Sequence, residues 1–293
     1  MLYKHLRTAI VMACTLCIYT ANAQVQVKEP TGGDPNWTKD YEPFRIIDNL
    51  YYVGSYDLGM YLITTPAGHI LINTGLASSA AMIQRHVEKL GFKMSDIKIL
   101  LTNQAHFDHM GGMAAVKKLT GAKMMVMDGD VEVAESGGSS DYVLGKYGVT
   151  FEPVKVDRIL HDGDEIALGD FKIKVLKHPG HTRGSCSYIF NAFYKKAIYR
   201  VLIANMPKML PEVNPAGMEG YADVGKDFEH TYNVMPKLPF DLWVAAHASQ
   251  FGLHKKHKPG AACNPDAFCD RKSYEATIEE LHQEYLEKRK SVR

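Results

Sequence analysis

The segment of residues 104–112 constrains this chain more than any other part of its sequence. It reads Gln-Ala-His-Phe-Asp-His-Met-Gly-Gly. An apolar run of strand length, residues 97–102, precedes it, and apolar residues at helical spacing, residues 113–119, follow it. The segment is therefore predicted to form the turn between a strand and a helix. In such a turn, neighbouring side chains are not held on opposite faces, so several can point into one small volume.

The side chains of this turn are of types that bind metal. His106, Asp108 and His109 supply two imidazoles and a carboxylate within four residues, a set that suits zinc. Gln104 adds an amide oxygen at the same place. A polar loop with incidental histidines is the alternative, and the rest of the chain must distinguish the two.

The first residues have the pattern of a secretory signal peptide. Lys4 and Arg7 precede an apolar run over residues 9–19, and Ala-Asn-Ala follows at 21–23. We expect cleavage between Ala23 and Gln24, a mature chain of residues 24–293, and a periplasmic location. The run is too short to cross a bilayer comfortably, and no other stretch could do so. We therefore expect no membrane contact once the signal peptide is cleaved. Residues 11–14, Val-Met-Ala-Cys, resemble a lipoprotein cleavage site only faintly, because the apolar run continues past Cys14.

The composition is that of an ordinary globular protein. The chain has 293 residues, 46% of them hydrophobic and 23% charged, and a formal net charge of +1. Without a basic surplus, no nucleic-acid partner is expected. Nothing in the composition indicates an oligomer, so we expect a monomer.

Three cysteines remain after removal of the signal peptide. Cys263 and Cys269 could pair across a short loop in an oxidising compartment. Cys186 lies in a strand-like run and is expected to be a buried, small apolar residue rather than a metal ligand.

Short β-prone runs alternate with helical patterns along the mature chain. The runs at 44–47, 50–53, 60–65 and 69–73 are separated by turn residues, which predicts antiparallel hairpins, and a helix ending near Gly91 follows. In the second half we expect a hairpin over 166–177, strands at 185–190, 198–204 and 242–246, and a last helix around 274–285. Two packed sheets covered by helices are predicted, an α/β (α+β) fold. Because nothing marks a linker, we expect one domain.

Further ligand-type residues stand at two other predicted strand ends. His181 follows Pro179 and Gly180, and His247 directly follows the strand at 242–246. Three independent placements of this kind are not expected by chance. They favour a metal centre over a polar loop.

Taken together, these motifs resemble the metallo-β-lactamase superfamily. The superfamily motif is His-x-His-x-Asp-His, followed by distant histidines. This chain has Gln104 in place of the first His, and in this it resembles the GOB-type enzymes of the third subclass. Residues 179–185, Pro-Gly-His-Thr-Arg-Gly-Ser, and 246–249, Ala-His-Ala-Ser, also match. The resemblance extends from Phe44 to the last helix and implies a four-layer αββα sandwich.

The resemblance implies zinc-dependent hydrolysis of the β-lactam amide bond of penicillins, cephalosporins and carbapenems, and hence antibiotic resistance. It implies up to two zinc ions, one held by Gln104, His106 and His181 and the other by Asp108, His109 and His247. Zinc with an open position lowers the pKa of bound water to about 7, which supplies a hydroxide to attack the lactam carbonyl. The second cation would stabilise the departing nitrogen anion. Asp108 would also orient the nucleophile.

Three departures from the superfamily pattern are informative. Gln104 is a poorer zinc ligand than histidine, so we expect the site of Asp108 to fill first. Asn73 stands where members commonly carry Asp, and we hypothesise that this change is coupled to the loss of the histidine. Asn205 and Met206 stand where glyoxalase II and lactonases usually carry a metal-bridging Asp.

The absence of a metal-bridging Asp weighs against lactonase and thioesterase activity. A secreted lactonase or thioesterase of the same superfamily is the second hypothesis, and a zinc-binding protein without turnover is the third. Lys208 is a candidate partner for the substrate carboxylate, although a surface lysine is equally compatible with its position. His178 could be a partner of a metal ligand, but we favour a polar residue at the rim of the site. We expect His254 and His257 on a solvated surface.

Overall fold

The first half of the chain folds into a seven-stranded sheet. The computed structural model describes residues 27–30 and 33–292, and the signal peptide expected over residues 1–23 lies outside them. The strands run in the order β1 (Phe44–Ile47), β2 (Leu50–Tyr52), β3 (Tyr61–Thr65), β4 (Gly68–Ile72), β5 (Ile97–Leu101), β6 (Lys123–Met127) and β7 (Arg158–Leu160). The first four pair antiparallel, which confirms the predicted hairpins, and β4 to β7 pair parallel.

The second half forms a five-stranded sheet. Its strands are β8 (Glu165–Leu168), β9 (Phe171–Lys177), β10 (Cys186–Tyr194), β11 (Ala197–Ala204) and β12 (Leu242–Ala245), in the spatial order β12-β11-β10-β9-β8. β8 to β11 pair antiparallel as a meander, and β12 adds parallel to β11. β9, β10 and β12 lead into or out of the segments that carry His181 and His247.

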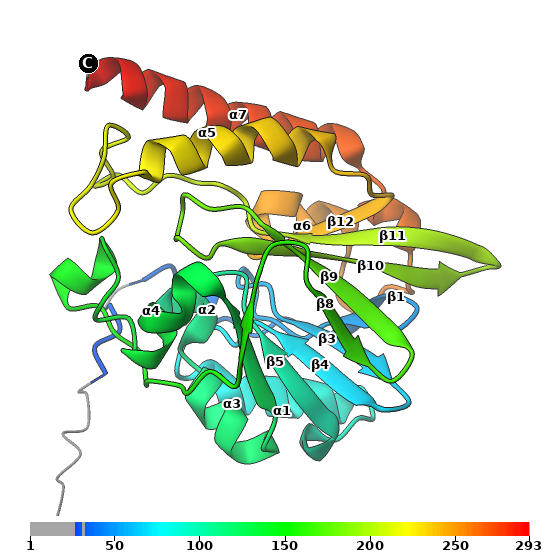
Figure 1. Ribbon diagram of the computed structural model, residues 1–293. Helices are drawn as coiled ribbons and strands as arrows, with labels where there is room; N and C mark the ends of the chain where they lie inside the picture. Colours follow the sequence, from blue (N-terminus) through cyan, green and yellow to red (C-terminus); the bar gives the residue numbers. More distant parts are fainter. Residues whose placement is uncertain (1–26, 31–32, 293) are drawn as a thin grey trace, which may run out of the picture.

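Helices cover the outer faces of both sheets, which confirms the expected four-layer αββα sandwich (Figure 1). α1 and α3 lie against the first sheet, and α5 and α7 lie over the second. The helices are α1 (Ser79–Lys89), α2 (Phe107–Met110), α3 (Met113–Thr120), α4 (Val131–Glu135), α5 (Val224–Val234), α6 (Leu253–Lys256) and α7 (Arg271–Ser291). Among the described residues, no helix has both the length and the apolar character that a membrane crossing requires.

The main core lies between the two sheets. Ile63 and Ile72 of the first sheet and Tyr188 and Trp243 of the second are fully buried in one cluster. A second cluster packs the other face of the first sheet against α1 and α3. Alternate strand residues therefore face two different apolar layers, which explains why strands such as β6 are apolar nearly throughout.

Two sequence expectations about polar residues are wrong, and one about a cysteine is confirmed. His257 is buried and stacks on Phe44 with ring centroids 3.5 Å apart, and half-buried His254 stacks on Tyr56 at 3.7 Å, so neither ring is freely solvated. Cys186 is buried as expected. The described part of the chain has no disulfide, since Cys263 and Cys269 are free thiols.

Candidate metal centre

The expected ligands converge at one end of the two sheets. His106, Asp108 and His109 lie in the turn after β5 and in the short helix α2, and all three side chains are buried. His181 lies between β9 and β10, and His247 follows β12. The first three residues come from one sheet and the last two from the other.

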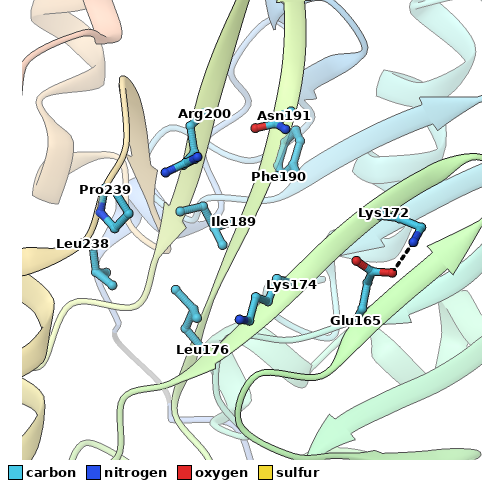
Figure 2. Close-up of a pocket in the computed structure, with 10 residues that line it drawn as sticks. All are labelled: Glu165, Lys172, Lys174, Leu176, Ile189, Phe190, Asn191, Arg200, Leu238 and Pro239. Atoms are coloured by element: carbon cyan, nitrogen blue, oxygen red, sulfur yellow. Dashed lines mark ion pairs between the residues drawn. The ribbon is translucent and has the colours of Figure 1, made fainter.

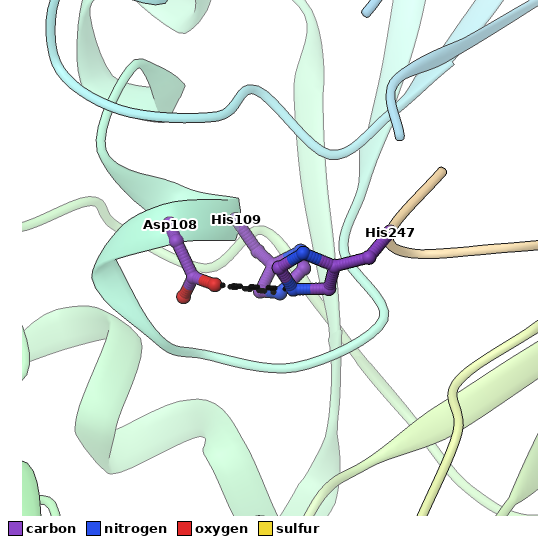
Figure 3. A group of neighbouring side chains, drawn as sticks. All are labelled: Asp108, His109 and His247. Atoms are coloured by element: carbon purple, nitrogen blue, oxygen red, sulfur yellow. Dashed lines mark ion pairs between the residues drawn. The ribbon is translucent and has the colours of Figure 1, made fainter. Parts of the chain in front are cut away.

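Three of these residues form a compact cluster. The Oδ2 atom of Asp108 lies 3.3 Å from Nε2 of His109 and 3.3 Å from Nε2 of His247 (Figure 3). One ligand atom from each residue lies within 4.8 Å of the others, a spacing at which a metal ion could be held. A carboxylate and two imidazoles suit zinc.

A second pair of imidazoles, one from each sheet, lies at the same end of the molecule. The rings of His106 and His181 have centroids 4.8 Å apart and an interplanar angle of 66°. Gln104 is buried two residues before His106. These are the three residues expected to form the first zinc site.

Two of the histidines are oriented by hydrogen bonds on the side away from the cluster. Nδ1 of His247 lies 3.1 Å from Oδ2 of Asp57, and Nδ1 of His181 lies 2.5 Å from the carbonyl oxygen of Lys208. A ring nitrogen that donates to oxygen leaves the other nitrogen as a lone-pair donor. The contacts therefore leave Nε2 of both residues free to bind a metal.

Within the centre, two buried imidazole nitrogens have no hydrogen-bond partner among the described residues. They are Nε2 of His106 and Nε2 of His109. Asp141 Oδ2 lies 3.4 Å from the first of these atoms but is not aligned for a hydrogen bond. Buried polar atoms are normally satisfied, so these orphaned nitrogens fit a site completed by a metal ion.

Three buried or half-buried carboxylates around the centre were not predicted from the sequence. Asp57 accepts hydrogen bonds from Trp37 Nε1 at 3.2 Å and from the Ser249 amide at 2.9 Å while it contacts His247. Asp141 accepts from two backbone amides of its own loop and faces His106. The third is Asp130.

Asp130 joins the two loops that carry His106 and His181. Its carboxylate accepts hydrogen bonds from the Ala105 amide at 2.8 Å, the Thr182 hydroxyl at 2.7 Å and the Gly184 amide at 2.8 Å. No pattern in the sequence marks this residue, because its partners lie far away along the chain.

Asn73 forms hydrogen bonds with Asn103, at the start of the ligand turn. It adopts a φ of 61°, and its Oδ1 accepts from the Asn103 amide at 2.9 Å. Its Nδ2 donates to the Gly59 carbonyl and to Asn103 Oδ1. The side chain thus supports the residue next to Gln104, and the proposed coupling between Asn73 and Gln104 stays a prediction.

Burial and neighbouring charges shift the pKa values of the cluster. Burial alone would raise the pKa of Asp108, but His109 and His247 hold it well below its usual value. Burial acts to lower the pKa of His247, yet Asp108 and Asp57 raise it to about 9. Desolvation, with the neighbouring His106, lowers the pKa of His181 to about 3, although part of that side chain faces solvent. Asp108 is therefore ionised at neutral pH.

The remaining candidates fall into two groups. Lys208 is exposed and lines a cleft of about 470 Å³ together with His247, Trp37 and Asp57. His178 is buried and its Nδ1 lies 2.8 Å from the Ser187 hydroxyl, so its prediction as a rim residue is wrong. Asn205 and Met206 are also buried, and neither carries a carboxylate.

Comparison with known proteins agrees with this geometry. The family model of the metallo-β-lactamase superfamily matches residues 60–192. A solved β-lactamase from Chitinophaga pinensis is 54% identical, with a TM-score of 0.86 over 88% of this chain and 97% of that one. The chain therefore belongs to the metallo-β-lactamase superfamily.

Two further solved structures define the branch of the superfamily. The metallo-β-lactamase GOB-18 from Elizabethkingia meningoseptica is 50% identical, with a TM-score of 0.89 over 91% of this chain and 98% of that one. The class B3 di-zinc metallo-β-lactamase LRA-12 from an Alaskan soil metagenome is 52% identical, with a TM-score of 0.87 over 89% and 99%. The resemblance to GOB-type enzymes of the third subclass is confirmed, and a fold of this family implies bound metal.

Curated relatives are more distant. A hydroxyacylglutathione hydrolase from Bradyrhizobium sp. (strain ORS 278) is 30% identical over 139 residues, which are 47% of this chain and 45% of that protein. This chain thus spans less than half the length of the hydroxyacylglutathione hydrolases that it matches.

Proposed function

We propose that this chain is a zinc-dependent β-lactamase that hydrolyses the amide bond of penicillins, cephalosporins and carbapenems and so confers resistance to them. The observation that carries the proposal is the cluster of Asp108, His109 and His247 beside the His106 and His181 pair, in a chain half identical to solved metallo-β-lactamases. Zinc is the metal that this mixture of imidazole and carboxylate suits.

Six residues would hold the metal, in two sets: Gln104, His106 and His181, and Asp108, His109 and His247. When bound, zinc supplies a Lewis acid that makes hydroxide available at neutral pH and stabilises developing negative charge. Asp108 would orient the attacking water, because its ionised carboxylate accepts a hydrogen bond. Asp57 holds the ring of His247 in place.

The two positions would fill unequally. The set with Asp108 offers an anionic ligand, whereas the set with Gln104 offers only a neutral amide and two imidazoles. We expect the Asp108 position to bind the first zinc equivalent and the Gln104 position to bind the second more weakly. Two equally tight equivalents in a zinc titration would contradict this.

The cleft beside His247 would take the substrate. It has a volume of about 470 Å³, within the range of small-molecule sites, and Lys208 lies on its lining. A β-lactam carries a carboxylate, and an exposed lysine at the edge of a metal site can pair with it. Lys208 is therefore proposed as a substrate contact.

Two alternative functions remain to be distinguished from β-lactam hydrolysis by experiment. A lactonase or thioesterase is favoured by the similarity to a hydroxyacylglutathione hydrolase, but here buried Asn205 and Met206 provide no bridging carboxylate. A zinc-binding protein without turnover would leave an open cleft unexplained. Purified chain should cleave nitrocefin and lose this activity with a chelator, while a homoserine lactone and a glutathione thioester stay intact. The reverse pattern would favour the alternatives.

We further propose cleavage of residues 1–23, a periplasmic location, and a single monomeric domain over residues 24–293. The pattern Ala-Asn-Ala at 21–23 supports the first two. Mass determination of the secreted chain tests the cleavage site, and sedimentation equilibrium tests the monomer.

A further inference from the structure

The hairpin of β10 and β11 extends beyond both of its neighbouring strands. β9 pairs with β10 only as far as Phe190, and β12 pairs with β11 only from Val201. Residues 191–200 therefore have no strand partner but one another, apart from the Arg200 carbonyl, which accepts the Asp241 amide at 2.8 Å, and the hairpin projects from the sheet (Figure 1). One face of the hairpin packs on the main core through Ala192, Tyr194 and Tyr199, so only the side chains of the other face are free for another contact.

Large apolar side chains are exposed near the end of this hairpin. Phe193 and Ile198 are directly paired across the strands, and each is 58% exposed. Cross-strand partners lie on the same face of a ribbon, so the two side chains form one apolar patch. On the opposite face, the half-buried rings of Tyr194 and Tyr199 lie with centroids 6.4 Å apart.

Two lysines form the turn between the strands. Lys195 and Lys196 have φ values of 46° and 67°, a conformation that Asn and Gly adopt with less strain. Both side chains are exposed, and neither belongs to an ion pair among the described residues. The turn thus carries two uncompensated positive charges beside the apolar patch.

A hollow of about 530 Å³ continues this surface toward the body of the protein (Figure 2). Leu176 and Ile189 contribute apolar lining, and Lys174 and Arg200 contribute cations that form no ion pair within residues 33–292. Glu165, the one acid on the lining, is paired with Lys172 at 2.7 Å.

Three further acids lie at the edge of this surface. Asp266 lies beside the Tyr199 hydroxyl, and the other two are engaged by the backbone. Asp48 accepts the Phe193 amide at 2.9 Å, and Asp241 accepts the Arg200 amide at 2.7 Å. Four unpaired cations still outnumber them, on a chain whose formal net charge is only +1. The positive surplus is therefore local to the hairpin and the hollow.

We propose that this hairpin docks the protein peripherally on an anionic phospholipid surface. Exposed aromatic and aliphatic side chains insert at the headgroup boundary, and the flanking lysines and arginine contact lipid phosphates. The contact adds to the proposed hydrolase function and differs from the expectation of no membrane partner. It involves no membrane crossing.

The position of the hairpin is compatible with catalysis. β10 begins just after the segment of His181 and runs away from the metal centre for nine residues, which is roughly 30 Å of strand. A docked molecule would hold its cleft away from the lipid and open to soluble substrate.

Sedimentation with vesicles tests the proposal. Wild-type protein should bind vesicles of phosphatidylethanolamine with about a third phosphatidylglycerol, and bind pure phosphatidylcholine at least about ten-fold more weakly. Two double variants should each weaken binding to the anionic vesicles at least about ten-fold: K195N/K196G, which removes both charges and suits the turn, and F193S/I198S, which removes the apolar patch.

A matched variant on α3, K118N/L119S, also removes an exposed lysine and an exposed large apolar residue, and it should bind as wild type. Unchanged thermal melting shows that each variant is folded, independently of any β-lactamase activity. Equal binding to neutral vesicles, no binding to either, or equal loss in the α3 variant would overturn the proposal. So would a concentration-dependent dimer that only the hairpin variants abolish, because the occupant would then be a second copy of this chain.

Discussion

Asp57 is a carboxylate outside the proposed metal ligands that contacts one of them, His247. It touches His247 on the side away from Asp108 and is itself fixed by Trp37 and Ser249. A histidine held in this way keeps the direction of its ring.

We therefore expect Asp57→Asn to weaken binding of the first zinc equivalent by about 10- to 100-fold, the usual cost of losing such a partner. Competition with a chelating dye measures the affinity. Asp34→Asn is the matched control, since Asp34 is an exposed carboxylate on the lining of the same cleft. Equal effects of the two substitutions would refute a specific role for Asp57.

Gln104 is the proposed ligand that sets the affinity for the second zinc equivalent. Gln104→His replaces an amide oxygen with imidazole, a better zinc ligand, so the second equivalent should bind at least about ten-fold more tightly while the first is unchanged. The same titration reports both affinities. A tighter first equivalent with an unchanged second one would show that Gln104 belongs to the other position.

At this scale the sequence predicts the ligand candidates but not their supports. His106, Asp108 and His109 lie within four residues of the chain, and their chemistry is visible in their residue types alone. Asp57 and Asp130 act only through contacts with residues far along the chain, and nothing in a single sequence marks such contacts.

The loop between β9 and β10 positions His181 through a close approach of backbone to α5. Gly180 has a φ of 132°, and a Cβ atom there would lie 2.8 Å from the Phe228 ring. Thr231 of the same helix donates to the Pro179 carbonyl at 2.7 Å. The loop is therefore held to the helix from two sides.

Gly180→Ala should destabilise the protein by about 2 kcal/mol or more, because it combines backbone strain with a clash. Gly121→Ala is the control: its φ of 67° imposes strain, but a Cβ atom there meets nothing within 4 Å. Denaturant unfolding should show the larger loss for Gly180. Equal losses would mean that contact with Phe228 is unimportant.

His178, directly after β9, makes the stability of the fold depend on pH. Burial lowers the pKa of His178 to about 4 from 6.5, so the unfolded chain binds a proton that the fold excludes. The stability from neutral His178 is complete above pH 6.5 and is lost as pH falls to 4, by about 3 kcal/mol. In metal-free protein, His178→Asn should flatten the stability profile in this window. An unchanged slope would contradict the assignment.

Element prediction succeeded where the pattern is local. β1 to β5 and β8 to β12 lie within a few residues of the predicted runs, because turn residues bound each one. β7 and α5 were not predicted: β7 has three residues with two exposed, and α5 begins with a β-branched residue and a glycine. His254 and His257 were misplaced because their stacking partners lie about 200 residues earlier.

For the whole molecule, the metal centre exists only because two sheets meet. His106, Asp108 and His109 follow the first sheet, while His181 and His247 belong to the second. The resemblance to a known superfamily predicted this meeting, whereas periodicity and spacing alone could not, since neither specifies how sheets pack.

The central claim is that these side chains hold zinc for the opening of a β-lactam ring. The most direct measurement is hydrolysis of a penicillin, a cephalosporin and a carbapenem by metal-free chain titrated with zinc, with bound zinc measured in parallel. We expect no turnover without metal, turnover that rises with occupancy, and loss of at least about a thousand-fold in Asp108→Asn. Full zinc occupancy with no hydrolysis of any of the three would contradict the claim.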